Sequence, residues 1–255
     1  MKLKIKNILN KKSIFNLSDS FHKSMEITSF PKKNKNTPPS WIKINYKTYP
    51  RLKRILLPKP AKTKNNIFKL LISRRSVRDF SDKTISLVKL STILYYSAGI
   101  TYIENNNWDV ALRSYPSGGA RYPLELYVLV NNVKKLKEGI YHYNVKDNYL
   151  ETLIETDCHK IIENITTQNI TKEANVVIII SAVFDRTRIK YGDRGYRFSF
   201  IESGHLAQNL YLVSEALSLG CCTIGGFIDD KINCLLDLND TCEKVIYLAA
   251  IGSKK

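Results

Sequence analysis

The sequence predicts an α+β fold. Segments with the alternating or β-branched composition of strands lie in the same part of the chain as segments with helix caps and helical apolar spacing. These segments do not follow the regular strand–helix–strand order of a doubly wound parallel sheet. A chain of 255 residues, 44% hydrophobic and 25% charged, is long enough to bury one large core or two small ones.

Residues 1–66 are expected to form a basic, proline-rich arm in front of a globular domain at residues 67–255. From residue 30 to residue 62, prolines recur every few residues without a helical period. Because proline fixes φ and lacks an N–H donor, this segment should be extended and wrap over other parts of the protein. Its apolar side chains are expected to pack on the globular domain or on a second subunit: Trp41, Ile42, Ile44, Tyr46, Tyr49, Ile55 and Leu56.

Three segments of the globular domain have the features of helices. Ile67–Ser73 is short and largely apolar, and residues 86–99 begin with Ser86 as N-cap and end at Gly99. Residues 199–220 are the longest of the three and end at Gly220. This last segment is apolar on most of its surface, which predicts a helix in the core or at a subunit interface.

Five segments have the features of strands. Leu124–Val130 and residues 175–184 are continuous apolar runs bounded by polar residues, as expected of strands buried on both faces. Residues 140–145 and 149–153 flank a polar turn and predict a hairpin. The run "KVIYLAAIG" near the C-terminus predicts a last strand.

The net charge of +17 is concentrated in the arm. Residues 1–78 hold 21 Lys and Arg against 2 Asp and Glu, whereas residues 79–255 hold 19 against 21. Such an arm favours acidic partners, namely RNA, an anionic membrane face or an acidic peptide, and lysine can equally serve only to solvate an exposed segment. Because the rest of the chain is nearly neutral, we do not expect a nucleic-acid-binding protein.

Several other classes are disfavoured. Apolar runs stop well short of the ~20 residues that a membrane span needs, and the basic start lacks the apolar run of a secretion signal, so the expected location is the cytoplasm. The five cysteines include no CxxC pair and the four histidines no HExxH spacing, so neither a disulfide framework nor a metal site is expected.

The stretch "SRRSVRDF" is a candidate phosphate site. Arg74, Arg75, Ser76 and Arg78 follow directly after the first predicted helix of the globular domain. Guanidinium groups and a hydroxyl match the shape and charge of a phosphate group. Taken alone, the same cluster is also typical of a solvated surface.

Two glycine pairs are candidate cofactor-binding turns. The first lies in "PSGGARYP", with Pro116, Ser117, Gly118 and Gly119, and the second, in "TIGGF", contains Gly225 and Gly226. Glycine lets another molecule approach the backbone closely, so their amides could bind the edge of a flat ring, although a simple turn before a strand fits the first pair as well. Neither pair has the GxGxxG or GxxxxGK spacing of the common nucleotide-binding folds.

Four ordered motifs carry a family resemblance. "RRSVRDF", "YPSGGARYPLELYVL", "IKYGDRGYRFSFIESGHLAQNLYL" and "TIGGF" together resemble the FMN-dependent nitroreductase superfamily, and within it the SagB-type dehydrogenases that form thiazoles and oxazoles in ribosomal peptides. The resemblance covers roughly residues 67–255, and the arm is similar to the N-terminal extension of that subgroup. It implies an intertwined homodimer with a central mixed or antiparallel sheet and two FMN molecules at the interface.

The resemblance also implies roles for the candidate residues. Arg74, Arg75, Ser76 and Arg78 would hold the phosphate and ribityl chain of FMN. Pro116, Ser117, Gly118 and Gly119 would reach the flavin from the partner subunit, and Gly225 and Gly226 would approach flavin N5. Lys254 is the candidate for the basic residue that completes the phosphate site, although "IGSKK" departs from the usual ending.

The adjacent Lys190 and Tyr191 match the catalytic signature of the SagB-type subgroup. Oxidation of a thiazoline or oxazoline ring needs a hydride acceptor, here FMN that dioxygen restores, and a base that removes a proton. Tyrosine has a free pKa of about 10 and is a poor base unless a neighbouring cation stabilises its phenolate. Lys190 could do so, although a lone Lys-Tyr pair is usually an exposed surface pair.

The remaining residues have simpler interpretations. His205 is expected to be a buried histidine with satisfied hydrogen bonds, and Gln208 could touch the flavin. Cys221 and Cys222 are expected to be small core residues. Arg121 and Tyr122 could line the substrate face.

Two alternatives to the dehydrogenase stay open. The same FMN site could work in the reducing direction, passing electrons from NAD(P)H to a dehydroamino acid, a quinone or a nitro compound. A non-enzymatic flavin-fold scaffold with a partner-binding arm is the other alternative. In the dehydrogenase interpretation, the arm could recruit an acidic leader peptide or a cyclodehydratase partner.

Overall fold

The protein is described here by a computed structural model that covers residues 16–26, 38, 41, 44–158, 161, 165–166 and 169–255. Its centre is a seven-stranded sheet in which every neighbouring pair is antiparallel. The strands lie in the order β1 (Arg54–Leu56), β8 (Tyr149–Glu155), β7 (Gly139–Asn144), β5 (Leu124–Val130), β9 (Val176–Val183), β11 (Glu243–Ser253) and β10 (Leu219–Ile224). The predicted α+β class is confirmed.

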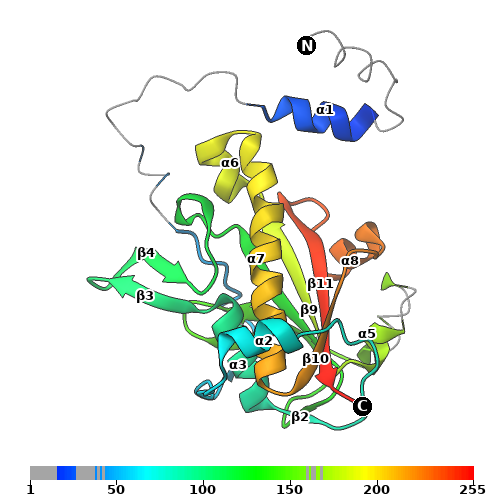
Figure 1. Cartoon of the computed structure of the whole chain (residues 1–255). Coiled ribbons are helices and arrows are strands. Elements are labelled where there is room, and N and C mark those ends of the chain that lie inside the picture. Colours follow the sequence, from blue (N-terminus) through cyan, green and yellow to red (C-terminus); the bar gives the residue numbers. More distant parts are fainter. Residues whose placement is uncertain are drawn as a thin grey trace, which may run out of the picture.

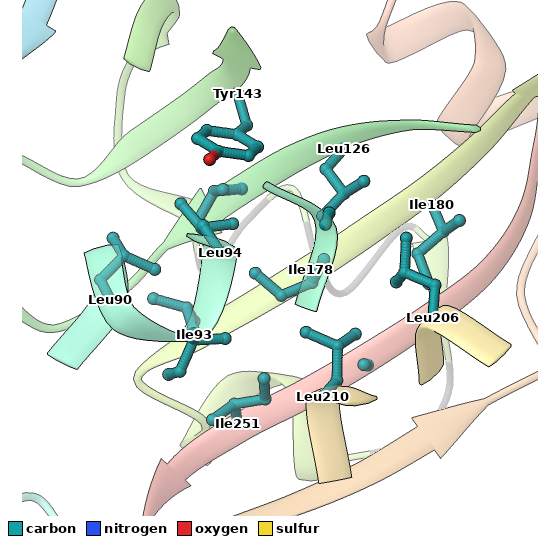
Figure 2. Packing of buried hydrophobic residues seen from close by; sticks show 14 of the residues in the cluster. Leu90, Ile93, Leu94, Leu126, Tyr143, Ile178, Ile180, Leu206, Leu210 and Ile251 are labelled. Atoms are coloured by element: carbon teal, nitrogen blue, oxygen red, sulfur yellow. The ribbon is translucent and has the colours of Figure 1, made fainter. Parts of the chain in front are cut away.

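Helices cover both faces of this sheet (Figure 1). Alternate residues of β5 point to opposite faces, because side chains alternate along a strand. Leu126 and Val128 join a core with α3 (Leu87–Ala98) and α7 (Arg194–Ala216), as Figure 2 shows for part of the cluster. Tyr127 and Leu129 belong to a second cluster, which includes residues of α5 (Ile170–Glu173) and α8 (Asp229–Leu235).

The predicted caps of α3 are confirmed. The Ser86 side chain accepts a hydrogen bond from the Lys89 amide, and Gly99 is the C-cap. Gly99 lies so close to the preceding turn that a Cβ there would meet the Tyr95 carbonyl oxygen at 2.5 Å. The predicted bounds of α2 (Ile67–Ser73) and β5 are also confirmed.

The longest helix differs from its prediction at both ends. α7 begins at Arg194, and two residues separate it from α6 (Asp185–Tyr191): Gly192, with a φ of 56°, and the N-cap Asp193. It ends at Ala216, so Gly220 does not end the helix and instead lies within β10. A Cβ at Gly220 would approach Val77 to 2.7 Å, so this glycine permits close packing of β10 against the segment after α2.

Part of the arm packs on the globular domain, as predicted. Ile44 is buried in the first core, and the Tyr46 hydroxyl donates to the Trp108 carbonyl. β1 extends the sheet at the edge formed by β8. Leu56 is an exception, with 79% of its side chain exposed, because it faces away on this edge strand, and Ile42 lies outside the described residues.

An ion pair fixes the arm to the sheet. Lys47 Nζ lies 2.6 Å from a carboxylate oxygen of Glu243 on β11 and 2.6 Å from the Tyr127 hydroxyl. Although burial opposes it, the charge of Glu243 raises the pKa of Lys47. The lysine therefore stays charged, and the arm is held by a partly buried salt bridge.

A second polar network continues beneath the arm. Glu151 accepts the Tyr49 amide and lies 2.7 Å from His142 Nδ1, while His142 Nε2 lies 3.1 Å from Glu125. Glu125 in turn pairs with Arg186 on α6 at 2.6 Å. Burial alone would lower the pKa of His142 and raise the pKa values of Glu125 and Glu151. The hydrogen bonds and opposite charges within the network outweigh burial, so the pKa of His142 is raised and those of Glu125 and Glu151 are lowered to about 2.

The sequence interpretation assigned no element to several shorter segments. They are α1 (Asn16–Ser24), β1, β2 (Ile85–Ser86), β3 (Ile100–Glu104), β4 (Asn107–Arg113), β6 (Val133–Lys134), α5, α6, β10 and α8. α1 contacts the start of α7, where Arg194 donates to the Met25 carbonyl (Figure 1). Within the described residues, no helix is long and apolar enough to cross a membrane.

Candidate functional site

The candidate phosphate residues lie between α2 and β10. Ser76 pairs as an isolated bridge with Cys221 of β10, and its Oγ lies 3.0 Å from the Tyr211 hydroxyl of α7. Tyr211 also accepts the Thr223 amide, and the Arg74 guanidinium lies 5.0 Å from its ring centroid. These contacts hold the Ser76 hydroxyl and the Arg74 cation against one face of the α7–β10 junction.

The cations of this region suit an anionic ligand. Within the described part of the chain, no carboxylate lies at ion-pair distance from Arg74, Arg75 or Arg78. Lys254 differs, because its Nζ is 2.7 Å from Glu215. Arg74 and Arg78 therefore leave an uncompensated positive charge that fits a phosphate group, whereas Lys254 is paired with Glu215, whose carboxylate also interacts with the charge of Arg75.

The turn at Pro116–Gly119 has the unusual backbone that its glycines predict. It continues as a short 3-10 helix at Gly118–Ala120, in which Gly119 has a φ of 61°. The Ser117 side chain accepts the Tyr122 amide at 2.8 Å. The Gly118 amide donates to Glu202 Oε1 of α7 at 2.9 Å.

Lys190 and Tyr191 lie directly against this turn. A Cβ on Gly119 would be 2.4 Å from the Tyr191 hydroxyl and 2.8 Å from Lys190 Nζ. The two side chains come from the last turn of α6 and are both half-buried. The structure thus brings together the Lys-Tyr pair and the first glycine pair, which are about 70 residues apart in the sequence.

Glu202 is a site residue that the sequence interpretation missed. Only 2% of its surface is exposed, and its Oε2 atom has no hydrogen-bond partner within the described residues. Burial raises the pKa of Glu202 to about 7, against the lowering effect of the Gly118 amide. The signal in the sequence was a lone acid on a largely apolar segment, in "FIESGH".

The second glycine pair follows β10 and borders an open pocket. Gly225 is exposed, and a Cβ there would have no neighbour within 4 Å. The pocket has a volume of about 600 Å³, and Phe184, Phe200 and Phe227 are among its walls. Gly225 therefore leaves room for a flat group to lie against the backbone.

On one chain, the two halves of the candidate site are separated along α7. Ser76 contacts this helix at Tyr211, and Gly118 contacts it at Glu202. Nine residues of helix correspond to roughly 14 Å. Between these points, α7 exposes a continuous stripe formed by Ile201, Gly204, His205 and Gln208.

Several expectations for single residues were wrong. Arg121 and Tyr122 are buried and do not line an open face, because Arg121 binds the carbonyls of Trp41 and Arg186. His205 is exposed, since it lies on the side of α7 that faces away from the sheet. Cys221 and Cys222 are buried core residues, as predicted.

Comparisons with known proteins identify the family of this chain. The model of the nitroreductase family matches residues 71–253. The nitroreductase-type protein MJ1384 of Methanocaldococcus jannaschii is 35% identical over 186 residues, which are 72% of this chain and 89% of that protein. The microcin B17-processing protein McbC of Escherichia coli is 26% identical over 133 residues, 50% of this chain and 49% of McbC. The trifolitoxin-processing protein TfxB of Rhizobium leguminosarum bv. trifolii is 29% identical over 143 residues, 53% of this chain and 38% of TfxB.

Solved structures share the fold. A nitroreductase-type protein of Anabaena variabilis superposes with a TM-score of 0.75 at 25% identity, over 94% of this chain and 47% of that one. A chain of the E. coli microcin synthetase McbBCD complex superposes with a TM-score of 0.61 at 20% identity, over 94% of this chain and 92% of that one. A Desulfovibrio desulfuricans nitroreductase-type protein, in complex with FMN, has a TM-score of 0.51 at 18% identity over 75% of this chain and 88% of that one. The sequence match and the shared fold together make this chain a member of the nitroreductase family, and hence an oxidoreductase.

Proposed function

We propose that this protein is an FMN-dependent dehydrogenase that oxidises thiazoline or oxazoline rings to thiazoles or oxazoles in a ribosomally synthesised peptide. The observation that carries the proposal is the contact of Lys190 Nζ and the Tyr191 hydroxyl with Gly119. Two relatives, named as processing proteins of microcin B17 and of trifolitoxin, support a peptide substrate.

The residues of the candidate site fit FMN. Arg74, Ser76 and Arg78 would hold its phosphate, since the arginines lack acidic partners among the described residues and the Ser76 hydroxyl is fixed by Tyr211. The open space at Gly225 would accept the edge of its ring. Bound FMN would supply a two-electron acceptor. Lys254 could join this site only by sharing its charge with Glu215.

Tyr191 would remove the proton that leaves the azoline ring. Its hydroxyl and the Lys190 ammonium lie on the same side of the turn, because both atoms lie within 3 Å of one point next to Gly119. Gly119 has no side chain, and this lets both groups lie directly against the backbone of the turn.

We further propose a homodimer in which a second copy completes each site. On one copy, the turn at Pro116–Gly119 and Ser76 contact α7 at points that are roughly 14 Å of helix apart. The exposed stripe of α7 lies between the two ends. α2 also exposes large apolar side chains, including Phe68 and Ile72, which a second copy would cover.

The basic arm could bind an acidic leader peptide or a cyclodehydratase partner. Removal of residues 1–40 tests this role: it also removes α1 and its contact with Arg194, whereas the docked part of the arm from residue 44 onward would remain in place. Unchanged peptide turnover and unchanged partner binding after this truncation would rule out the role.

Flavin spectroscopy tests the main proposal. The purified protein should be yellow, and an azoline-containing peptide should bleach the flavin without oxygen, after which air should restore the colour. The variant Tyr191→Phe should keep the bound FMN but lose the bleaching. Rapid bleaching by NAD(P)H and none by the peptide would instead establish a reductase, and a colourless protein that takes up no FMN would favour a scaffold.

A further inference from the structure

Glu202 has contacts that the proposed proton transfer does not use. Its Oε1 accepts the Gly118 amide at 2.9 Å, while its Oε2 is buried without a partner in the described part of the chain. An unsatisfied buried polar atom costs about 1–3 kcal/mol, so such an atom in a native protein calls for an explanation.

The polar groups that face Glu202 come from the segment before the turn. Arg113 at the end of β4 is buried with two unpartnered nitrogen atoms among the described residues, and the buried Tyr115 hydroxyl is also unpartnered there. Burial raises the pKa of Glu202 to about 7, while Gly118, Ser117 and Arg113 act in the opposite direction. Burial also raises the pKa of Tyr115, which therefore stays neutral.

A short series of contacts joins Glu202 to the Lys-Tyr pair. The Gly118 amide is bonded to Glu202, and the next residue, Gly119, meets Tyr191 and Lys190. Phe198 of α7 supports both sides, because its ring packs edge-to-face on Tyr191 at 5.0 Å between centroids and would lie 3.2 Å from a Cβ on Gly118.

We propose that Glu202 is a positioning residue for the Lys190–Tyr191 pair. When its carboxyl group is ionised, Glu202 holds the Pro116–Gly119 turn firmly, and when the carboxyl group is protonated, it holds the turn loosely. A hydrogen bond to a carboxylate is roughly twice as strong as one to a neutral group. Ionisation of Glu202 therefore tightens the turn against the pair. The consequence for catalysis rests on the proposed function, whereas the response of the turn does not.

The Gly118 amide reports this response directly. Protein labelled with 15N-glycine and with 13C at the serine carbonyl gives signals for Ser-Gly pairs only, which in this sequence are Ser117–Gly118 and Ser203–Gly204. The variant Ser203→Ala removes the second signal and so assigns the first. The Gly118 signal should shift with pH around a midpoint near 7.

Matched variants identify the titrating group. Glu202→Gln keeps an oxygen that can accept the Gly118 amide but cannot ionise, so the Gly118 signal should stay near its position and lose the transition. Glu215→Gln, on the same helix but paired with Lys254, should leave the transition unchanged. Should Glu202→Gln not fold, Glu202→Asp, with a carboxylate one methylene shorter, should displace the midpoint. No transition in the wild-type protein, or the same one in Glu202→Gln, would overturn the proposal.

The pH profile of turnover separates this proposal from the proposed function. With an azoline peptide, kcat of the wild-type protein should rise through an inflection near pH 7, and Glu202→Gln should flatten it with little change in KM. If the Gly118 signal titrates but no azoline is oxidised, only the proposed function fails. If azolines are oxidised but the profile of Glu202→Gln keeps its inflection, the positioning role fails.

Discussion

Substitution of Gly119 by alanine tests the contact on which the site depends. The residue has a φ of 61°, and an added Cβ would lie 2.4 Å from the Tyr191 hydroxyl. The left-handed backbone costs alanine about 1–2 kcal/mol. Displacement of the Tyr191 side chain adds about 1 kcal/mol. This value is at the low end of the cost of overpacking, because the contacted hydroxyl is the far end of a side chain that can move. The free energy of unfolding should therefore fall by about 2–3 kcal/mol.

A double-mutant cycle isolates the contact itself. In the Tyr191→Phe background the hydroxyl is absent, so Gly119→Ala should cost less: the backbone share of about 1–2 kcal/mol and the displacement of the flexible Lys190 Nζ, 2.8 Å from the added Cβ, remain. The coupling should be at most about 1 kcal/mol. Urea unfolding monitored by circular dichroism measures all four proteins. Gly204→Ala serves as a control, because a Cβ there has no neighbour within 4 Å. An equal cost of Gly119→Ala in both backgrounds would mean that the hydroxyl does not touch the glycine and would refute the geometry.

Three further predictions concern charge. Lys47→Met should lower the free energy of unfolding by about 3 kcal/mol, because it leaves a buried carboxylate unpaired, whereas Lys53→Met, in an exposed pair, should cost less than about 1 kcal/mol in the same urea assay. Glu125 and Glu151 have pKa values near 2, below the usual 4.5, so their ionised forms stabilise the fold above about pH 4.5, and this contribution should be lost as pH falls toward 2. Thermal unfolding measured across this range should show the loss, and a flat profile would contradict it. Arg74→Gln should weaken FMN binding by about tenfold or more in a fluorescence titration, as expected for loss of a hydrogen bond to a charged group.

The elements that sequence predicted well are those with local signals. The cap residues Ser86 and Gly99 predicted the two ends of α3, and the continuous apolar run at Leu124–Val130 predicted both ends of β5. Both signals are local, because a helix cap and a strand buried on both faces are each specified by a few consecutive residues. Gly220 was misread for the opposite reason. Its lack of a side chain serves a contact with Val77, far away in the sequence, which no local pattern reveals.

In the candidate site, too, local motifs could be predicted, whereas contacts between distant segments could not. The motifs identified Gly119 and the Lys190–Tyr191 pair separately, but only the fold places them in contact. Glu202 was missed because its neighbours on α7 are those of an ordinary buried helix, and its distinguishing partner is a backbone amide from another segment.

The position of the Lys-Tyr pair depends on charges that lie far from it in the sequence. α6 begins beside Arg186, which donates to the Tyr122 carbonyl and pairs with Glu125. Glu125 is linked through His142 and Glu151 to the backbone of the arm. Since each of these groups is buried, removal of any one leaves an unpaired charge, and the cost of that charge keeps the others in place. The arm is thus part of the structure that fixes α6.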